Sequence, residues 1–262
     1  MRDLMGVPAG RATFAGLDWR WFESGDGPEA VILLPGAVGG ADIFFIVFRR
    51  FAASRRVLAV DVPYAGDATQ VLAGLDALLD SRGVRRAVFL GASYSGLLVQ
   101  VYARRFPDRT RALILSHTGA LDPSRAERER RSAAVASRLP LWLTRGVLKM
   151  VVRMLLRKSA HAALFKDLYF DALDGLSRED LVSRYLLGAS LEEQGGITWR
   201  GPVLIVHSND DVVARPAEQG RLRAAYPGAD WQEFRGAGHS AYSLDPQRYA
   251  DVLFEWTAKA AP

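Results

Sequence analysis

Three side chains of this 262-residue chain have the types needed to attack a carbonyl group: Ser93, Asp211 and His239. A serine hydroxyl is too weakly acidic to supply an alkoxide unaided, so a histidine must take its proton. That histidine needs a carboxylate, which fixes its tautomer and stabilises its cation. The sequence therefore predicts a triad in which Ser93 attacks, His239 carries the proton and Asp211 orients the imidazole.

The residues around Ser93 favour its role as a nucleophile. Residues 91–96 read Gly-Ala-Ser-Tyr-Ser-Gly and stand between an apolar run at 87–90 and a helical spacing at 97–105. A serine at such a strand-turn-helix junction takes a strained conformation that exposes its hydroxyl at the edge of a sheet. The positions two before and two after it must be small, because strand and helix pass close together. Gly91 meets this need, whereas Ser95 stands where a second glycine is usual.

The acid and the histidine of the predicted triad each follow a predicted strand. The apolar run 203–207 leads into Ser-Asn-Asp-Asp at 208–211, and residues 236–239 read Gly-Ala-Gly-His. Glycines before a histidine let the imidazole approach other backbone closely. Asp211 is favoured as the acid because it lies three residues after Ser208, and Asp210 is the alternative.

The tetrahedral oxyanion formed by such an attack needs two backbone N–H donors. One comes from the residue after the nucleophile, here Tyr94, and the other from a loop after the third strand. That loop is residues 35–40, Pro-Gly-Ala-Val-Gly-Gly, whose glycines allow the required amide orientation. We expect Ala37 to be the second donor, with Val38 as the alternative.

Alternating strand and helix patterns must position these groups, and they predict an α/β fold with a mostly parallel central sheet flanked by helices. Strands are expected at 12–14, 17–23, 30–34, 57–62, 87–90, 112–116, 203–207 and 231–234, and helices at 42–52, 71–81, 97–105, 216–226 and 247–258. The first two strands form a hairpin. Residues 120–199 show helical patterns only, so we expect a helical lid there, inserted after the sixth strand. Residues 1–119 and 200–262 would then form the core.

The lid contains an unusual basic helix. Residues 138–166 carry seven basic residues and no acidic one, and Arg145, Lys149, Arg153 and Arg157 repeat every four residues along one helical face. Apolar residues lie opposite. The favoured interpretation is a lid whose apolar face covers the active site and whose arginine stems extend into solvent. The alternative is peripheral contact with an anionic membrane or an acidic carrier.

Aromatic residues of the lid predict an apolar substrate pocket. Trp142, Phe165 and Tyr169 are available to line it, together with Val38 and His117. The alternative for His117 is a buried structural histidine with satisfied hydrogen bonds. An acyl or aromatic ester suits such a pocket better than a sugar or a phosphate.

The whole chain resembles the α/β-hydrolase fold superfamily, in which the triad follows the order of Ser93, Asp211 and His239. Residues 35–45 (PGAVGGADIFF), 62–64 and 91–96 (GASYSG) look most like the maspardin-like branch. The superfamily resemblance implies a serine hydrolase, and the branch resemblance implies an adaptor-like protein. The chain departs from the usual hydrolase pattern at Pro35 and Ser95.

We therefore expect a serine hydrolase that cleaves a small, apolar carboxylic ester or thioester through an acyl-enzyme. The alternatives are a non-catalytic, maspardin-like binding protein and an acyltransferase or lyase on the same fold. The absence of cysteine excludes thiol catalysis and zinc-thiolate sites. We expect no metal, no cofactor, no nucleic-acid partner despite the net charge of +5, and no integral membrane segment. We also expect a cytoplasmic location, because residues 1–10 do not have the pattern of a signal peptide.

Overall fold

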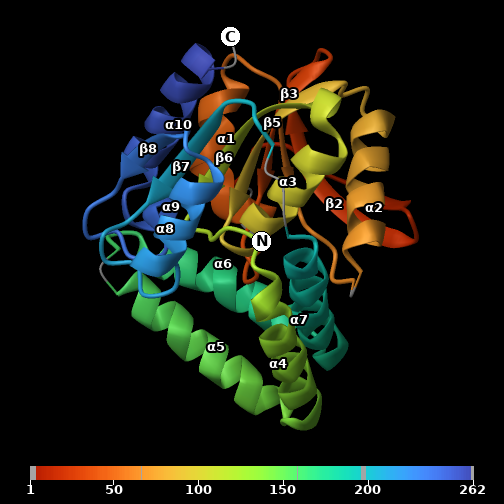
Figure 1. The fold of residues 1–262 in the computed structure, drawn as a ribbon, viewed down its shortest axis with the longest axis vertical. Coiled ribbons are helices and arrows are strands. Elements are labelled where there is room, and N and C mark those ends of the chain that lie inside the picture. The colour runs from red at the N-terminus through yellow and green to blue at the C-terminus, as the bar shows by residue number, and fades with distance from the viewer. Residues whose placement is uncertain (1–3, 66, 158, 196–198, 261–262) are drawn as a thin grey trace.

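The computed structural model describes residues 4–65, 67–157, 159–195 and 199–260, and the strands in these ranges form one eight-stranded sheet (Figure 1). The strands are β1 (Ala9–Phe14), β2 (Leu17–Ser24), β3 (Glu29–Leu34), β4 (Val57–Val60), β5 (Arg86–Ala92), β6 (Thr110–Ser116), β7 (Val203–His207) and β8 (Asp230–Glu233). Their order is β1-β2-β4-β3-β5-β6-β7-β8. The pairs β1–β2 and β2–β4 are antiparallel, and all other neighbours are parallel. The predicted mostly parallel sheet with an opening hairpin is confirmed.

Helices cover both faces of this sheet. Their bounds are α1 (Phe45–Ala52), α2 (Ala68–Ser81), α3 (Tyr94–Arg105), α4 (Ala126–Arg138), α5 (Leu141–Leu156), α6 (Ala162–Gly175), α7 (Arg178–Glu193), α8 (Pro216–Ala225), α9 (Ala241–Leu244) and α10 (Pro246–Ala260), with short 3-10 helices at Ala41–Phe44, Pro107–Arg109 and Pro123–Arg125. Helices α2, α3 and α8 pack on one face, and α1 and α10 on the other. The sequence patterns missed the short helix α9, because four residues are too few to show a period.

Side chains of β3 illustrate how the sheet builds two cores. Val31 and Leu33 point to the face covered by α1 and α10, whereas Ile32 and Leu34 point to the face covered by α2 and α3. Successive side chains of a strand alternate between faces, so a strand buried on both sides must be apolar throughout. This explains the unbroken apolar runs seen in the sequence.

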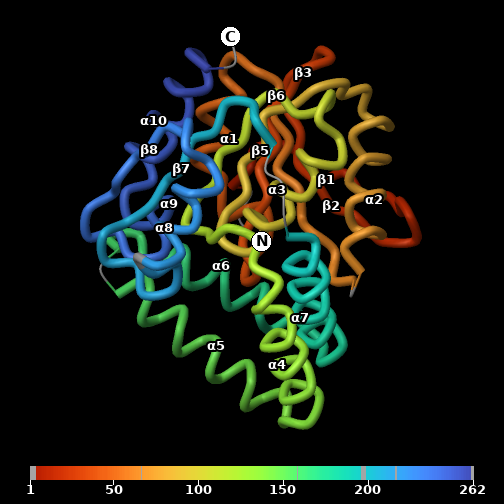
Figure 2. Tube along the Cα trace, in the orientation of Figure 1, coloured from red at the N-terminus to blue at the C-terminus, as the bar shows by residue number. Residues whose placement is uncertain are grey.

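Helices α4 to α7 form the connection between β6 and β7 and occupy the end of the molecule opposite the C-terminus (Figures 1 and 2). The insertion after the sixth strand is thus present and helical. Within it α4 lies along α7, and α5 along α6. Its role as a lid stays a prediction. None of the helices among the described residues has the length and apolar character required to cross a bilayer.

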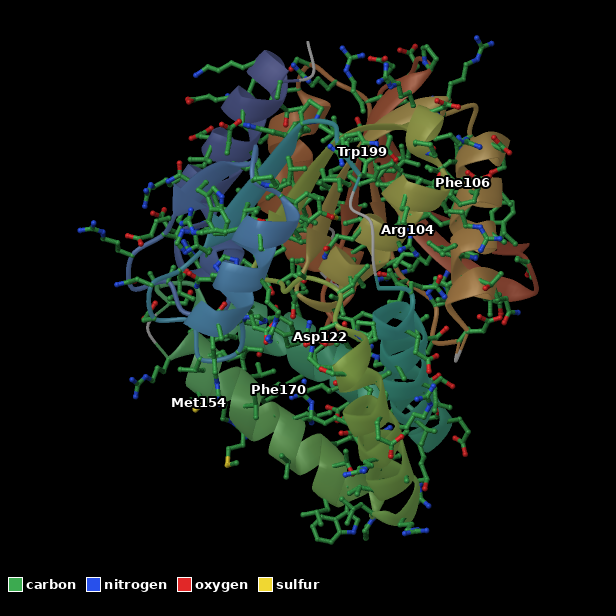
Figure 3. The ribbon with its side chains drawn as sticks, viewed as in Figure 1. Arg104, Phe106, Asp122, Met154, Phe170 and Trp199 are labelled. Atoms are coloured by element: carbon green, nitrogen blue, oxygen red, sulfur yellow. The ribbon has the colours of Figure 1, made fainter. Side chains whose placement is uncertain are left out.

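Buried charges fasten this insertion to the sheet core. The Arg125 guanidinium lies 3.1 Å from Glu192 at the end of α7 and 2.8 Å from Glu218 on α8. Glu192 also accepts a hydrogen bond of 2.6 Å from the backbone N–H of Asp122, which lies where the chain enters the insertion (Figure 3). Burial raises the pKa of Glu192 to about 7. The two ends of the insertion are therefore tied to each other and to α8.

The expected orientation of α5 is wrong. Its cationic face does not extend wholly into solvent: Arg145 and Lys149 are half-buried on the side of α6, where the Lys149 ammonium pairs with Asp174 at 2.6 Å, whereas Arg153 and Arg157 are exposed. The Arg153 guanidinium lies 4.8 Å from the centre of the Phe170 ring, which Figure 3 places between α5 and α6. Much of the apolar face is exposed instead. The carboxylate and the aromatic ring on α6 provide partners for the cations, and helical periodicity alone carries no information about them.

Candidate active site

Ser93 stands at a sharp turn between β5 and α3, as the sequence predicts. Its backbone has φ 49° and ψ −114°, a conformation that is rare for a residue with a side chain. A Cβ at Gly91 would lie 2.4 Å from the Ser95 carbonyl oxygen, and one at Gly96 would lie 2.5 Å from Thr118. Only glycine fits at either position. The close approach that the motif demands is therefore made at 91 and 96, which leaves residue 95 free to carry a side chain.

The three predicted triad side chains meet at this turn. His239 Nε2 lies 2.9 Å from Ser93 Oγ, and His239 Nδ1 lies 2.9 Å and 3.0 Å from the two Asp211 carboxylate oxygens. The Asp211 carboxylate also accepts the backbone N–H groups of Val213 and Ala214. Burial alone would raise the pKa of Asp211, but the hydrogen bond and charge of His239 outweigh it, and the pKa is lowered. Asp211 is thus held ionised behind the imidazole.

Asp210 has a different position. Its Oδ1 accepts the backbone N–H of Gly238 at 2.8 Å, and Asn209 Oδ1 accepts that of Gly236 at 2.9 Å. Both side chains thus hold the loop that carries His239. The geometry favours Asp211, which contacts the ring itself, as the acid.

The loop at 35–40 passes beside Ser93. A Cβ at Gly36 would lie 3.4 Å from the Ser93 Cβ, and Ala37 and Tyr94 border the same cavity of about 680 Å³. Among the described residues, neither the Ala37 nor the Tyr94 N–H donates to a backbone carbonyl. Both amides therefore remain available to an oxygen atom held near Ser93.

A half-buried ion pair between Arg20 and Asp61 holds the far end of this loop. Asp61, directly after β4, accepts the backbone N–H of Ala41 at 2.5 Å and is hydrogen-bonded by the Arg20 guanidinium. Arg20 also lies 3.5 Å from Asp42, whose pKa is raised by burial. The sequence reasoning missed Arg20 and Asp61. A carboxylate that follows a parallel strand lies at the same sheet edge as Ser93, and this was the available signal.

Two cavities flank the site. The larger one, of about 680 Å³, lies between the 35–40 loop and the helices α6 and α7. Its lining includes seven charged residues: Arg11, Asp18, Arg20, Asp61, Asp171, Asp180 and Arg184. The smaller one, of about 180 Å³, is bordered by His239, by the charged residues Arg157 and Asp210, and by the apolar side chains of Met154, Leu155, Val212 and Leu244. The larger cavity is therefore rich in charged groups, and the smaller one has a mostly apolar wall.

Arg184 is the most unusual group in the larger cavity. It is only 6% exposed, and its guanidinium lies 3.8 Å from the centre of the Tyr64 ring. Its Nε and Nη2 have no hydrogen-bond partner among the described residues, and burial lowers its pKa to about 9. Its own carbonyl accepts the Tyr94 hydroxyl at 3.0 Å. A buried cation with unused donors is suited to an anion. No sequence motif marked this residue.

The lid aromatics predicted to line the pocket lie elsewhere. Trp142 is 74% exposed at the start of α5, which corrects its assignment as a pocket residue. Phe165 is buried in the core, and Tyr169 packs against Gly39 with its hydroxyl bonded to Tyr242. Val38 is half-buried against the same core. Among the described residues, none of these lines either cavity. The aromatic side chains of these helices therefore lie in the core or on the outer surface, and not beside Ser93.

His117 is close to the triad but turned away from the cavities. It is 2% exposed, its Nε2 lies 2.9 Å from Ser208 Oγ, and its Nδ1 lies 3.0 Å from Ser116 Oγ. Its ring centre is 6.0 Å from that of His239. Burial, and then the nearby His239, lower the pKa of His117 to about 3. The geometry matches the alternative of a neutral structural histidine.

Comparisons with known proteins agree with this architecture. The family model described as the alpha/beta hydrolase fold matches residues 29–246. A 2-hydroxy-6-oxononadienedioate/2-hydroxy-6-oxononatrienedioate hydrolase of Paraburkholderia phymatum is 24% identical, over 89% of this chain and 88% of that protein.

Solved structures show the same fold at low identity. A thermophilic esterase from Thermogutta terrifontis superposes with a TM-score of 0.78 at 17% identity, covering 98% of this chain and 100% of that one. An epoxide hydrolase from Bacillus megaterium gives 0.78 at 13% identity, covering 95% and 100%. The maspardin-like resemblance stays a prediction. The match over most of the chain, together with the sheet order and the turn at Ser93, shows that the chain belongs to the α/β-hydrolase fold family.

Proposed function

We propose that this protein is a serine hydrolase that cleaves a carboxylic ester or thioester through an acyl-enzyme. The observation that carries the proposal is the line of hydrogen bonds from Ser93 Oγ through His239 to the buried Asp211 carboxylate. The strained backbone at Ser93 adds support, because such strain persists at functional sites.

The geometry supports a two-step reaction. Ser93 Oγ attacks the substrate carbonyl carbon while its proton passes to His239 Nε2, and the oxyanion accepts the Ala37 and Tyr94 N–H groups. Collapse breaks the bond to the alcohol or thiol, which leaves with the proton from His239. Water then attacks the acyl-serine, gives a proton to His239 and releases the acid. The proton returns to Ser93.

The two cavities support a substrate with one apolar part and one anionic group. Met154, Leu155 and Val212 favour an acyl or aromatic moiety beside His239. On the other side, the unused donors of Arg184 favour a carboxylate. This modifies the purely apolar substrate expected from the sequence, because the aromatic residues that suggested it do not line the cavities.

A second candidate function is hydrolysis of a carbon–carbon bond next to a keto group in an acidic substrate. Arg184 favours it, and so does the name of the Paraburkholderia relative, which describes hydrolysis of dicarboxylates with a 6-oxo group. The same triad would serve both reactions. Product analysis with an acidic ester and an oxo-dienoate separates the two.

Labelling with a fluorophosphonate probe tests the hydrolase proposal. Wild type and Ser95→Ala are expected to label, and Ser93→Ala is expected not to. A folded wild type that stays unlabelled would favour the non-catalytic binding role instead. A series of chromogenic esters of increasing acyl length, each with and without a terminal carboxylate, then defines the substrate.

A further inference from the structure

Positive charge is concentrated in one segment of the chain. Residues 130–166 hold nine of the 34 basic residues and none of the 29 acidic ones. The remainder, with 25 basic and 29 acidic residues, is net negative. This segment includes the end of α4 and all of α5, which together form the edge of the molecule farthest from the C-terminus (Figure 1). The protein is therefore electrically polar along its long axis.

The same edge carries most of the exposed apolar side chains. Seven of the ten large hydrophobic residues exposed in the described part of the chain lie between 135 and 154, with exposures from 37% to 74%. They are Val135, Leu139, Trp142, Leu143, Val147, Met150 and Met154. Their spacing of mostly three or four residues places those on α5 on one helical face. Helix α5 thus has apolar side chains on both its buried and its exposed sides, and the described part of the chain covers only the buried side.

Cations without carboxylate partners border this apolar stripe. Arg138, Arg153 and Arg157 are exposed, and none of them pairs with an acid among the described residues. A groove of about 460 Å³ between α4 and α5 contains Val135, Leu139, Leu143 and Val147 and is also bordered by Arg128 and Arg131. An apolar strip edged by arginine is the pattern of a helix that lies at a bilayer surface.

The stripe leads to the active site. Met154, at its end, lines the smaller cavity together with His239, and Figure 3 shows Met154 at the outer side of α5. Val212, exposed on the loop after β7, borders the same cavity. A surface that covers the stripe would therefore lie at the mouth of that cavity.

We propose that the α4–α5 edge, residues 135–157, docks on an anionic lipid bilayer. The exposed apolar side chains enter the interface, Trp142 takes the position that tryptophan favours there, and the arginines bind lipid phosphates. The net negative remainder of the molecule is repelled by the same surface, which fixes the orientation. An acidic carrier protein would account for the arginines. It would not account for an apolar strip that follows α5 for about 24 Å.

Sedimentation with lipid vesicles tests this docking. Wild type is expected to sediment with vesicles of phosphatidylglycerol and phosphatidylcholine, and far less with phosphatidylcholine alone. Arg138→Gln, Arg153→Gln and Arg157→Gln combined should weaken binding about 100-fold, since each cation near the surface contributes about tenfold or somewhat less. The matched control removes three exposed charges elsewhere, by Arg49→Gln, Arg85→Gln and Arg86→Gln, and should bind as wild type.

The apolar contribution is tested separately. Trp142→Ser with Met150→Ser should weaken binding at least about tenfold, whereas Leu186→Ser, an exposed site on α7, should not. A blue shift of tryptophan emission on adding anionic vesicles should disappear in Trp142→Phe. Fluorophosphonate labelling in the absence of vesicles monitors folding of each variant. Failure of wild type to sediment, or equal loss in the control variants, would overturn the proposal, as would binding only to an acidic carrier protein.

Discussion

The Ser95 hydroxyl donates a hydrogen bond to the backbone carbonyl of Pro35, and this bond joins the turn at Ser93 to the neighbouring 35–40 loop. These are the two positions at which the sequence departs from the usual hydrolase pattern. Ser95 has no exposed surface, and its hydroxyl is engaged in this bond. The two departures form one contact, which fixes the loop that presents Ala37.

Replacement of the two serines should have opposite consequences. Ser93→Ala should lower kcat by about 10⁴-fold or more, because the proposed nucleophile is lost. Ser95→Ala should change kcat less than about tenfold and lower the free energy of unfolding by about 1 kcal/mol, because the Pro35 carbonyl loses its donor. Ester turnover and urea denaturation measure these effects. Equal loss of activity in both variants would contradict the assignment.

Asp211 and Asp210 provide a matched pair of carboxylates. Asp211→Asn should lower kcat by about 10⁴-fold, because an amide can stabilise neither the required tautomer nor the imidazolium. Asp210→Asn should cost less than about tenfold, since the amide oxygen can still accept the Gly238 N–H. Steady-state kinetics at neutral pH distinguishes the two. The reverse ranking would assign the acid to Asp210.

His117 should make the fold sensitive to acid. Its pKa is lowered to about 3 in the folded protein by burial, and then by His239, against about 6.5 in an unfolded chain. Between these values the unfolded chain binds a proton that the folded chain does not. His117 should therefore lower the free energy of unfolding by up to about 1.4 kcal/mol for each unit that the pH falls. Glu192, whose pKa burial raises to about 7 from 4.5, has the opposite effect between these values, in wild type and variant alike.

The check is urea denaturation at pH 7, 5.5 and 4. His117→Gln, which retains a donor for Ser208, should show a shallower decline over this range. The lowered pKa of Asp211, caused by His239 against the opposing effect of burial, adds to the decline only below about pH 4, and it does so in both proteins. Parallel curves for the two proteins would show that His117 is not the cause.

Arg184 should lower the stability of the fold while it contributes to recognition of an anionic substrate. Arg184→Met removes a buried, incompletely bonded cation, so the free energy of unfolding should be unchanged or higher. The same change should lower kcat/KM for a carboxylate-bearing ester by about 10- to 100-fold, and leave that for a neutral ester of equal length nearly unchanged. Arg178→Met, at an exposed site on the same helix, is the control. A parallel loss on both esters would indicate a structural role.

The sheet and the meeting of Ser93, Asp211 and His239 were predictable because their signals are local. Gly91, Ser93 and Gly96 encode the turn within six residues, and the strand preceding Asp211 reads as an apolar run. In a parallel sheet, the carboxyl ends of strands meet at one edge, so groups far apart in sequence gather without any further information.

The insertion was less predictable because its contacts are distant. Helical periodicity predicted that α5 has a cationic face and an apolar face. It could not predict the partners of the cations, which are Asp174 and Phe170 on α6. Arg184 is buried beside Tyr64, which follows β4 and lies far from it in the sequence. For Trp142, the neighbouring sequence does not indicate whether the side chain lines a pocket or lies on the outer surface, where the structure places it.

Tyr94 links the two halves of the site through a single residue. Its N–H borders the larger cavity beside Ser93, and its hydroxyl is bonded to the Arg184 carbonyl on α7. Exchange of the insertion for that of a relative would therefore break a bond to a residue of the core. Chimeras that transplant the insertion alone should lose turnover, and those that exchange residue 94 together with it should recover it. The insertion and the turn at Ser93 would therefore have to be changed together, whether by design or in evolution.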